Sequence, residues 1–371
     1  MDFSLSDEQR ALAELAAKIL SDRASLERLK AIERSDERYD RELWTDFARA
    51  GLLGAALPEE VGGSGGGFVE LCLLLEQQGK RVAMIPLLST LVAAAMPIER
   101  FGSPTQRERY LPGIVGGETL LSAALVELGA DPRFPAASAS RDGAGWRLDG
   151  VKVAVPIAHL ATAVLMPART ASGEVAIFLV DPKTPGIRLE RQEAMSWEPQ
   201  SRMELAGVRL GEDALLGSIE RGAEILDWTI ERATVGLCAI ASGACQEAVR
   251  LTAEYSSNRK QFDKPIAMFQ AVGQRLADAY IDNEAVNLTM WQAATRLAAD
   301  QPAAEEVAVA KFWASDGGNR IGHTGLHVHG GISIDVDYPI HRYFLWLKQI
   351  ENTLGSASSE LVRLGALLAA Q

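Results

Sequence analysis

The chain has little cysteine and lacks a long hydrophobic run, and each absence excludes a class of protein. Its three cysteines, Cys72, Cys238 and Cys245, are too few and too scattered for a disulfide framework or a zinc site, which favours a reducing compartment. No segment reaches the roughly 18 apolar residues that a membrane span needs. The first residues lead into charged positions rather than into the apolar region of a signal peptide. We therefore expect a cytoplasmic protein without a membrane span.

Positive charge is also scarce. Lysine and arginine number 37 against 49 aspartates and glutamates, which gives a formal net charge of -12. This balance argues against nucleic acid and anionic membrane surfaces as partners. The hydrophobic fraction of 47% and the charged fraction of 23% are ordinary for a globular protein. A chain of 371 residues is long enough for more than one domain and a large core.

The spacing of apolar residues changes twice along the chain, and the changes predict three domains. Helical spacing prevails at both ends, whereas short apolar runs separated by turn dipeptides such as Asp142-Gly143 occupy the middle. The predicted fold class is α+β. It comprises an N-terminal helical domain over 1–118, a middle antiparallel β domain over 119–218 and a C-terminal four-helix bundle over 219–371.

The same periodicity predicts the individual elements. The predicted helices cover 6–31, 41–49, 68–78, 87–101, 104–116, 224–256, 267–298, 303–318 and 341–370. The predicted strands cover 120–126, 146–148, 151–155, 163–167, 175–180 and 208–210. Pro265 is expected to open one of the long helices, because a proline's missing N–H would have no partner there.

The connection between the first two bundle helices carries the most specific pattern in the chain. It reads Arg259-Lys260-Gln261-Phe262-Asp263-Lys264-Pro265-Ile266 and continues with Phe269-Gln270-Ala271-Val272. A guanidinium and a phenyl ring at this connection, called the elbow below (residues 259–270), suit a flat anionic cofactor, although a solvated loop has the same local chemistry. The residue types and their spacing resemble the flavin-binding turn of the acyl-CoA dehydrogenase family.

Two further segments resemble the same family. Leu57-Pro58-Glu59-Glu60-Val61-Gly62-Gly63-Ser64-Gly65 is similar to the loop between its early helices, and it lacks the Lys-Ser/Thr of a phosphate-binding loop. His327-Val328-His329-Gly330-Gly331 resembles the family's Gln-x-x-Gly-Gly, which meets the flavin pyrophosphate of a neighbouring subunit. Neither histidine has a carboxylate or cysteine at ligand spacing, so no metal site is expected there.

The resemblance implies an acyl-CoA dehydrogenase-like fold with FAD as cofactor. It implies cofactor contacts from the elbow and from the glycine segment, namely Arg259, Phe262, Phe269, Gln270, His327, Gly330 and Gly331. The implied reaction introduces a Cα–Cβ double bond into an acyl-CoA thioester, with a glutamate removing the Cα proton and a hydride passing to flavin N5. Implied partners are the acyl-CoA, an electron-transfer flavoprotein or similar acceptor, and further subunits in a homotetramer or a heterotetramer with a homologous subunit.

The middle domain departs from the family where it would cover the flavin ring. Val126-Glu127-Leu128-Gly129-Ala130-Asp131 stands in place of Thr-Glu-Pro-Gly-x-Gly-Ser. Ala154-Val155-Pro156 stands in place of Trp-x-Thr or Trp-x-Ser. Val126 and Val155 are therefore the expected cofactor positions in this domain, with backbone N–H groups as the remaining donors.

The catalytic base also differs from the family's usual pattern, because the usual glutamate position holds Leu354. A minority of members places the base on the first bundle helix just before an arginine, and Glu231-Arg232 matches that arrangement. Neighbours of Glu231 on its own helix face are small or apolar, which would partly desolvate its carboxylate. These neighbours are Thr234, Val235, Cys238 and Ser242. The alternative is that Glu231 pairs with Arg232 or a neighbouring helix and has no chemical role.

Three functions remain open from the sequence. The favoured one is an FAD-dependent acyl-CoA dehydrogenase of fatty acid or steroid side-chain β-oxidation, acting alone or as one subunit of a heteromeric enzyme. The second is a non-catalytic partner subunit that completes the flavin site of a homologous active subunit. The third keeps the fold with another flavin chemistry, such as that of an oxidase or monooxygenase.

Overall fold

The computed structural model describes residues 3–370, which form two compact units. One unit joins residues 1–31, 72–83 and 234–371, and the other joins residues 32–71 and 84–233. The domain boundaries at 118 and 218 stay predictions. In the described residues, no helix is long and apolar enough to cross a membrane.

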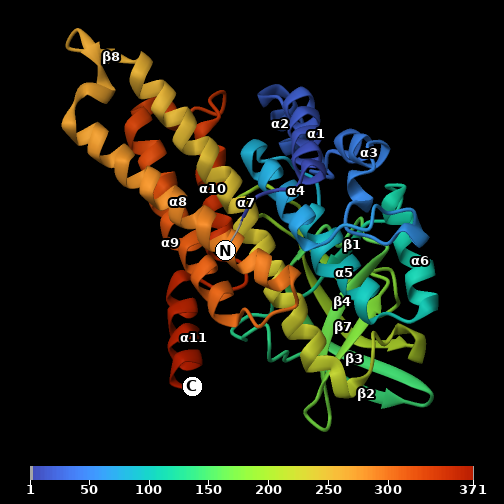
Figure 1. The fold of residues 1–371 in the computed structure, drawn as a ribbon. Helices are drawn as coiled ribbons and strands as arrows, with labels where there is room; N and C mark the ends of the chain where they lie inside the picture. The colour runs from blue at the N-terminus through green and yellow to red at the C-terminus, as the bar shows by residue number, and fades with distance from the viewer. Residues whose placement is uncertain (1–2, 371) are drawn as a thin grey trace. The chain divides into compact units, whose positions relative to one another are not determined.

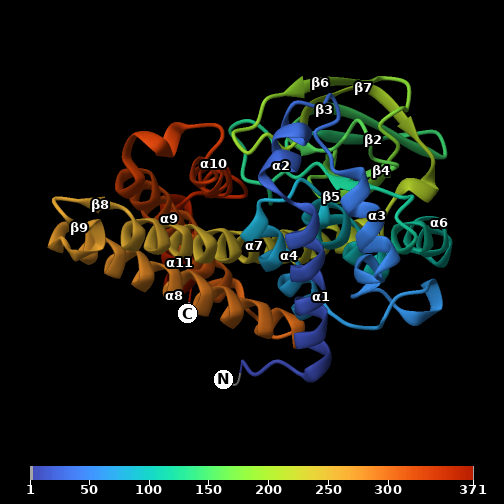
Figure 2. The same cartoon turned by 90° about the horizontal axis from the view of Figure 1, so that it is seen from above.

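The first unit is helical, and its centre is the C-terminal bundle. The helices that lie wholly or mostly in it are α1 (Asp7–Arg23), α2 (Leu26–Glu33), α4 (Phe68–Arg81), α7 (Gly222–Asn258), α8 (Gln270–Ala298), α9 (Ala304–His329), α10 (Ile340–Glu351) and α11 (Ala357–Ala369). α9 packs against α8, α10 and α11 (Figures 1 and 2). α4 and α7 approach closely, because a Cβ on Gly243 would lie only 1.9 Å from the Glu76 carbonyl oxygen.

Two long helices predicted from the sequence are broken in the structure. The segment 6–31 forms α1 and α2, because Ser25 starts a new helix by accepting a hydrogen bond from the Arg28 N–H at 3.2 Å. The segment 341–370 forms α10 and α11. Leu354 and Gly355 between them have left-handed φ angles of 53° and 113°, which no continuous helix allows.

Two other helix boundaries also differ from the prediction. The helix expected over 303–318 continues to His329, because Gly318 and Gly322 let α10 pack closely rather than ending the helix. Pro265 does not open a helix. It lies in the strand β9 (Lys264–Pro265), which pairs with β8 (Lys260–Gln261), and the 3₁₀ turn η6 (Ile266–Met268) follows before α8 begins.

The second unit contains the sheet and several N-terminal helices. Its helices are α3 (Arg41–Arg49), the π-helix η3 (Leu88–Ala95), α5 (Met96–Phe101) and α6 (Pro104–Val115). Its strands are β1 (Leu121–Ala123), β2 (Ser138–Asp142), β3 (Gly145–Pro156), β4 (Ala163–Thr170), β5 (Val175–Val180), β6 (Ile187–Gln192) and β7 (Gln200–Leu210). The 3₁₀ turns of the two units are η1 (Leu52–Gly54), η2 (Glu59–Val61), η4 (Glu212–Ala214), η5 (Ile219–Arg221), η6 and η7 (Gly330–Ile334).

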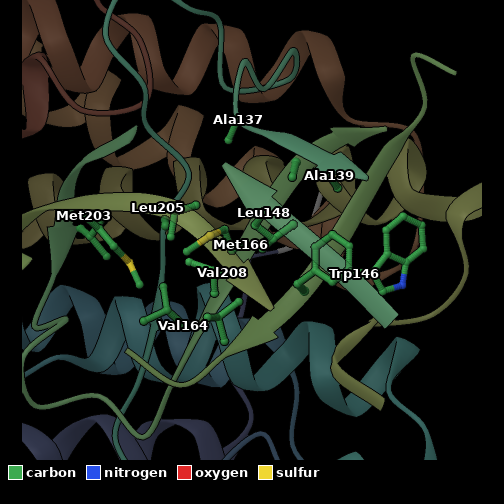
Figure 3. Close-up of a cluster of buried hydrophobic side chains, with 14 of the residues drawn as sticks. Ala137, Ala139, Trp146, Leu148, Val164, Met166, Met203, Leu205 and Val208 are labelled. Carbon is green, nitrogen blue, oxygen red and sulfur yellow. The ribbon is translucent and has the colours of Figure 1, made fainter. Parts of the chain in front are cut away.

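The sheet has seven strands in the order β1-β4-β2-β3-β7-β6, and β5 pairs with β4. Most pairs are antiparallel as predicted, but β4 runs parallel to β1 and β2, so the purely antiparallel prediction is wrong for these pairs. The predicted strands 146–148 and 151–155 are one strand, β3, interrupted by a register shift at Gly150. One face of the sheet buries a core that includes Trp146, Met166 and Met203 (Figure 3).

A lysine is fully buried in the bundle. Lys311 Nζ donates to Ser315 Oγ at 2.9 Å and to the Ile350 carbonyl oxygen at 2.7 Å, so it caps the end of α10. Burial lowers the pKa of Lys311 to about 8 from an ordinary value of 10.5.

This burial predicts a specific pH dependence of stability. Between pH 8 and 10.5 the unfolded chain holds the Lys311 proton more strongly than the folded chain does, so stability rises with pH in this window. Urea titrations of the wild type and of Lys311→Met give the difference between their free energies of unfolding. From pH 7 to pH 10 this difference should change by about 2 kcal/mol in favour of the wild type. A difference that stays constant over this range would show that Lys311 is not the buried cation described.

Candidate cofactor site and catalytic base

The elbow is an ordered hairpin whose aromatic tip is exposed. Arg259 N–H donates to the Tyr255 carbonyl oxygen at 2.8 Å, and Ile266 N–H donates to the Arg259 carbonyl oxygen at 2.8 Å. Phe262 turns the chain with a φ of 51°, and 87% of its surface is exposed. A phenyl ring held outward on a fixed turn is typical of a contact with a ligand or another chain.

Arg259 and Phe269 complete this surface. The Phe262 and Phe269 rings lie 6.2 Å apart edge to face, and Lys264 Nζ lies 4.4 Å from the Phe269 ring. Arg259 is exposed and forms no ion pair with any residue that the structure describes. Gln270 is exposed at the first position of α8. The elbow therefore carries an exposed guanidinium and two rings on one short hairpin, which suits an anionic group attached to a flat one.

The Gly330–Gly331 turn directly follows α9. Gly330 has φ 64° and ψ -139°, a conformation that residues other than glycine rarely adopt. A Cβ at either glycine would meet nothing within 4 Å, so open space lies beside this backbone. His327 is exposed, whereas His329 is buried. Both residues lie in α9, beyond the range 303–318 that was predicted for this helix. The exposed glycines fit a close approach by a phosphate group.

The structure brings the elbow and this glycine turn to the same end of the bundle. Tyr255 precedes the elbow by one helical turn, and its ring stacks on His329 with centroids 4.4 Å apart. The Tyr255 hydroxyl also donates to the His329 carbonyl oxygen at 3.4 Å. In Figure 1 the β8 hairpin lies at the far end of α7 and α8. The free guanidinium, the exposed ring and the open glycine backbone together fit the phosphate portion of a dinucleotide.

Of the two middle-domain positions, Val155 lies on β3 and Val126 forms an isolated bridge to the same strand. Val153 N–H donates to the Val126 carbonyl oxygen at 3.0 Å, so Val126 pairs with β3 two residues before Val155. Val126 is half-buried, and the Val155 side chain is fully buried in the β core. Ala154 has a φ of 51° at a register shift of β3. Val155 as a whole has no exposed surface, and it pairs with Ser201 of β7.

A buried ion pair supports this part of the β domain. Lys152 Nζ donates to Glu127 Oε1, and both side chains are buried. Glu127 Oε2 also accepts the Ala136 N–H at 2.6 Å, and Oε1 accepts the Ala137 N–H at 3.1 Å. Burial lowers the pKa of Lys152, against the opposing attraction of Glu127. Glu127 thus fixes the two ends of the loop between residues 127 and 137.

Removing the cation from this pair should destabilise the protein. Lys152→Met leaves a buried carboxylate with backbone donors only, which costs about 3 kcal/mol of unfolding free energy. Arg147→Met on the same strand is the matched control, because its pair with Asp149 is solvent-exposed and contributes less than about 1 kcal/mol. Urea unfolding measures both variants, and equal losses would contradict a special role for the buried pair.

Glu231 lies on α7 and is half-buried. Its neighbour Arg232 is buried, with the guanidinium 3.8 Å from the Trp228 ring. The following residues on the predicted face are all buried, as the sequence predicted from their small or apolar character. They are Thr234, Val235, Cys238 and Ser242. A carboxylate beside such a strip has limited access to water, as a general base requires.

The usual base position of the family offers no alternative. Leu354 occupies a left-handed turn between α10 and α11, and it cannot accept a proton. The nearby Glu351 forms an ion pair with Lys348 at 2.8 Å. Glu231 therefore stays the candidate base of this chain.

Glu231 and the elbow lie at different places along α7. Glu231 is in the first third of this helix, whereas Arg259 directly follows its last residue, so roughly 40 Å of helix at 1.5 Å per residue separates them.

Sequence reasoning missed the contact that joins the two cofactor segments. Tyr255 and His329 were not candidate residues, and they are 74 positions apart. The one available signal was the position of each ring, four residues before Arg259 and directly before Gly330.

Comparisons with known proteins identify the family. Residues 6–118 match the acyl-CoA dehydrogenase N-terminal domain, and residues 220–363 match the acyl-CoA dehydrogenase C-terminal domain. The acyl-CoA dehydrogenase FadE27 of Mycobacterium tuberculosis is 38% identical over 378 residues, covering 100% of this chain and 99% of that protein. The chain therefore belongs to the acyl-CoA dehydrogenase family of oxidoreductases.

Two solved structures are similar to this chain over nearly its whole length. One is a variant of the Tcur3481–Tcur3483 steroid ACAD, with 44% identity, a TM-score of 0.93 and 99% coverage of both chains. The other is the ChsE4–ChsE5 complex from Mycobacterium tuberculosis, with 38% identity, a TM-score of 0.95 and 100% coverage of both chains. These findings confirm the predicted acyl-CoA dehydrogenase-like fold and the resemblance to two-subunit members. Membership of this flavoprotein family also confirms FAD as the cofactor.

Proposed function

We propose that this chain is one subunit of a heterotetrameric FAD-dependent acyl-CoA dehydrogenase that acts on a bulky acyl-CoA, such as a steroid side-chain thioester. The observation that carries the proposal is that Arg259, Phe262 and the Gly330–Gly331 turn occupy one end of the bundle, remote along α7 from Glu231. The related Tcur3481–Tcur3483 steroid ACAD and ChsE4–ChsE5 complex support the two-subunit form, and the former supports the substrate class.

The proposed chemistry assigns a separate task to each group of residues. The Glu231 carboxylate takes the Cα proton of the acyl thioester, and the buried strip beside it keeps water away. FAD, when bound, supplies the acceptor for the Cβ hydride at N5. Arg259 would neutralise pyrophosphate charge of the cofactor of an adjacent subunit, Phe262 would pack on that cofactor, and the backbone of Gly330 and Gly331 would donate to its oxygens. An electron-transfer flavoprotein or similar acceptor would take up the electrons.

A second candidate has its own supporting observation. The Val155 side chain lies in the β core, and the segment after Val126 lacks the hydroxyls of its family counterpart. In this second function, the β domain would not hold a flavin ring. The chain would be a non-catalytic partner whose elbow completes the flavin site of a homologous active subunit.

Expression alone and together with a homologous subunit separates the two functions. If the chain takes part in the chemistry, acyl-CoA should bleach the flavin of the co-purified complex. This bleaching should be lost when Glu231 is replaced. A non-catalytic partner should raise the flavin content of the complex, while Glu231 is dispensable. A monomer in light scattering that still carries flavin would contradict both, because each requires a cofactor shared between chains.

A further inference from the structure

Two aromatic rings lie between the two proposed cofactor segments. Tyr255 lies on α7, and its carbonyl oxygen accepts the N–H of Arg259. His329 is the last residue of α9 and directly precedes Gly330. The ring planes are inclined by only 26°, with centroids 4.4 Å apart, so the two rings form a stacked pair.

The His329 ring is fixed from several sides. Nδ1 lies 2.8 Å from the Gly325 carbonyl oxygen, and because a carbonyl can only accept, Nδ1 carries the proton. The Tyr338 ring lies 5.3 Å away at an inclination of 55°, and its contact with Tyr255 closes a three-ring cluster. His329 Nε2 is buried and has no hydrogen-bond partner among the described residues. The histidine therefore acts through its ring face and its Nδ1 bond, and not as a ligand of the cofactor.

The positions of these rings give the stack a mechanical consequence. A shift of Tyr255 carries the first residue of the elbow with it through the backbone, and a shift of His329 carries the glycine turn. The stack therefore joins the backbone that precedes Arg259 to the backbone that precedes Gly330.

We propose that Tyr255 and His329 are positioning residues that hold the Arg259 elbow and the Gly330–Gly331 turn at the spacing required by one pyrophosphate. This inference rests on the proposed function of the two segments as a shared flavin site. The proposal assigns neither ring a contact with the cofactor. Together the two rings affect the affinity for the cofactor, because the elbow and the Gly330–Gly331 turn bind one pyrophosphate only when their spacing is correct.

A double-mutant cycle on the co-purified two-subunit complex tests the pair. The dissociation constant of FAD is measured after removal and re-addition of the cofactor, for Tyr255→Ala, His329→Ala and the double variant. Each single change should weaken FAD binding by about tenfold, the size of one aromatic pair. The double variant should be no weaker than the singles, because either change already removes the stack.

Conservative and matched variants separate positioning from general stability. Tyr255→Phe keeps the stacked ring and should retain FAD affinity within about threefold. His323→Ala is the matched control, since it removes a ring from the same helix α9 that contacts Phe344 at 5.0 Å, away from the stack. It should lower the melting temperature without weakening FAD binding.

Each outcome decides the inference. Losses of affinity that simply add in the double variant, or that His323→Ala reproduces, would overturn the positioning role while leaving the shared site intact. Unchanged FAD affinity in both alanine variants would do the same. A wild-type complex that binds no FAD would instead overturn the proposed function, and the inference with it.

Discussion

Glu231→Gln is expected to reduce the turnover of the two-subunit enzyme by roughly 10²–10⁴-fold, the usual contribution of a general base. The amide keeps the size of the side chain but cannot accept the Cα proton. The half-buried position on α7 and the buried strip that follows it are the reasons for the expected size of the loss. Anaerobic single-turnover bleaching of the flavin by acyl-CoA measures the chemical step directly, and FAD content should be unchanged.

Glu224→Gln provides the control for this variant. Glu224 lies in the first turn of α7, is exposed and pairs with Arg221 at 2.8 Å, so its neutralisation should leave bleaching rates as they are. Unchanged bleaching in Glu231→Gln would show that the base belongs to the partner subunit. The chain would then be the non-catalytic partner.

Arg259→Ala is expected to weaken FAD binding to the complex by roughly 10- to 100-fold, because it removes charge-assisted hydrogen bonds to a pyrophosphate. The side chain is exposed and forms no ion pair within the described part of the chain, so its removal should cost little stability. Fluorescence titration of the apo-complex with FAD gives the affinity, and circular dichroism gives the helix content.

Lys260→Ala is the matched control for Arg259, since it removes a neighbouring exposed cation from the same hairpin. It should weaken FAD binding by less than about threefold through general charge alone. Equal losses in the two variants would indicate a diffuse electrostatic effect, and a parallel loss of helix content in Arg259→Ala would indicate a structural arginine.

The sequence predicted a short connection between two long helices at the elbow, because helical periodicity is local information. It did not predict the β8–β9 hairpin, and the cofactor role of the elbow stays a prediction. Residue types such as Arg259 and Phe262 at fixed spacing lie on one short hairpin, and their exposure follows from that hairpin. The α+β class followed in the same way from periodicity, which depends on a few neighbouring positions at a time.

Features that depend on packing between distant segments could not be predicted. The helix predicted over 303–318 ended at Gly318, but in the structure α10 packs against α9 at Gly318 and Gly322. The parallel pairing of β4 with β1 and β2 is likewise set by the order of strands in the sheet. The Tyr255–His329 stack joins two helices that the sequence separates widely, and no local pattern encodes it.

The β domain contains features that the sequence shows directly and features that depend on packing. The missing hydroxyls near Val126 were visible in the sequence, whereas the burial of Val155 and the ion pair between Glu127 and Lys152 were not. Whether a strand residue faces a ligand or the core depends on its register, and the register shift in β3 changes it locally.

The most direct measurement is a cryo-EM or crystal structure of the chain co-purified with its homologous subunit and FAD. The pyrophosphate density should lie within hydrogen-bonding distance of Arg259 and the Gly330–Gly331 turn of one chain, with the flavin ring on the β domain of another. An elbow that projects into solvent, or an FAD bound entirely within one chain, would contradict a cofactor site shared between subunits.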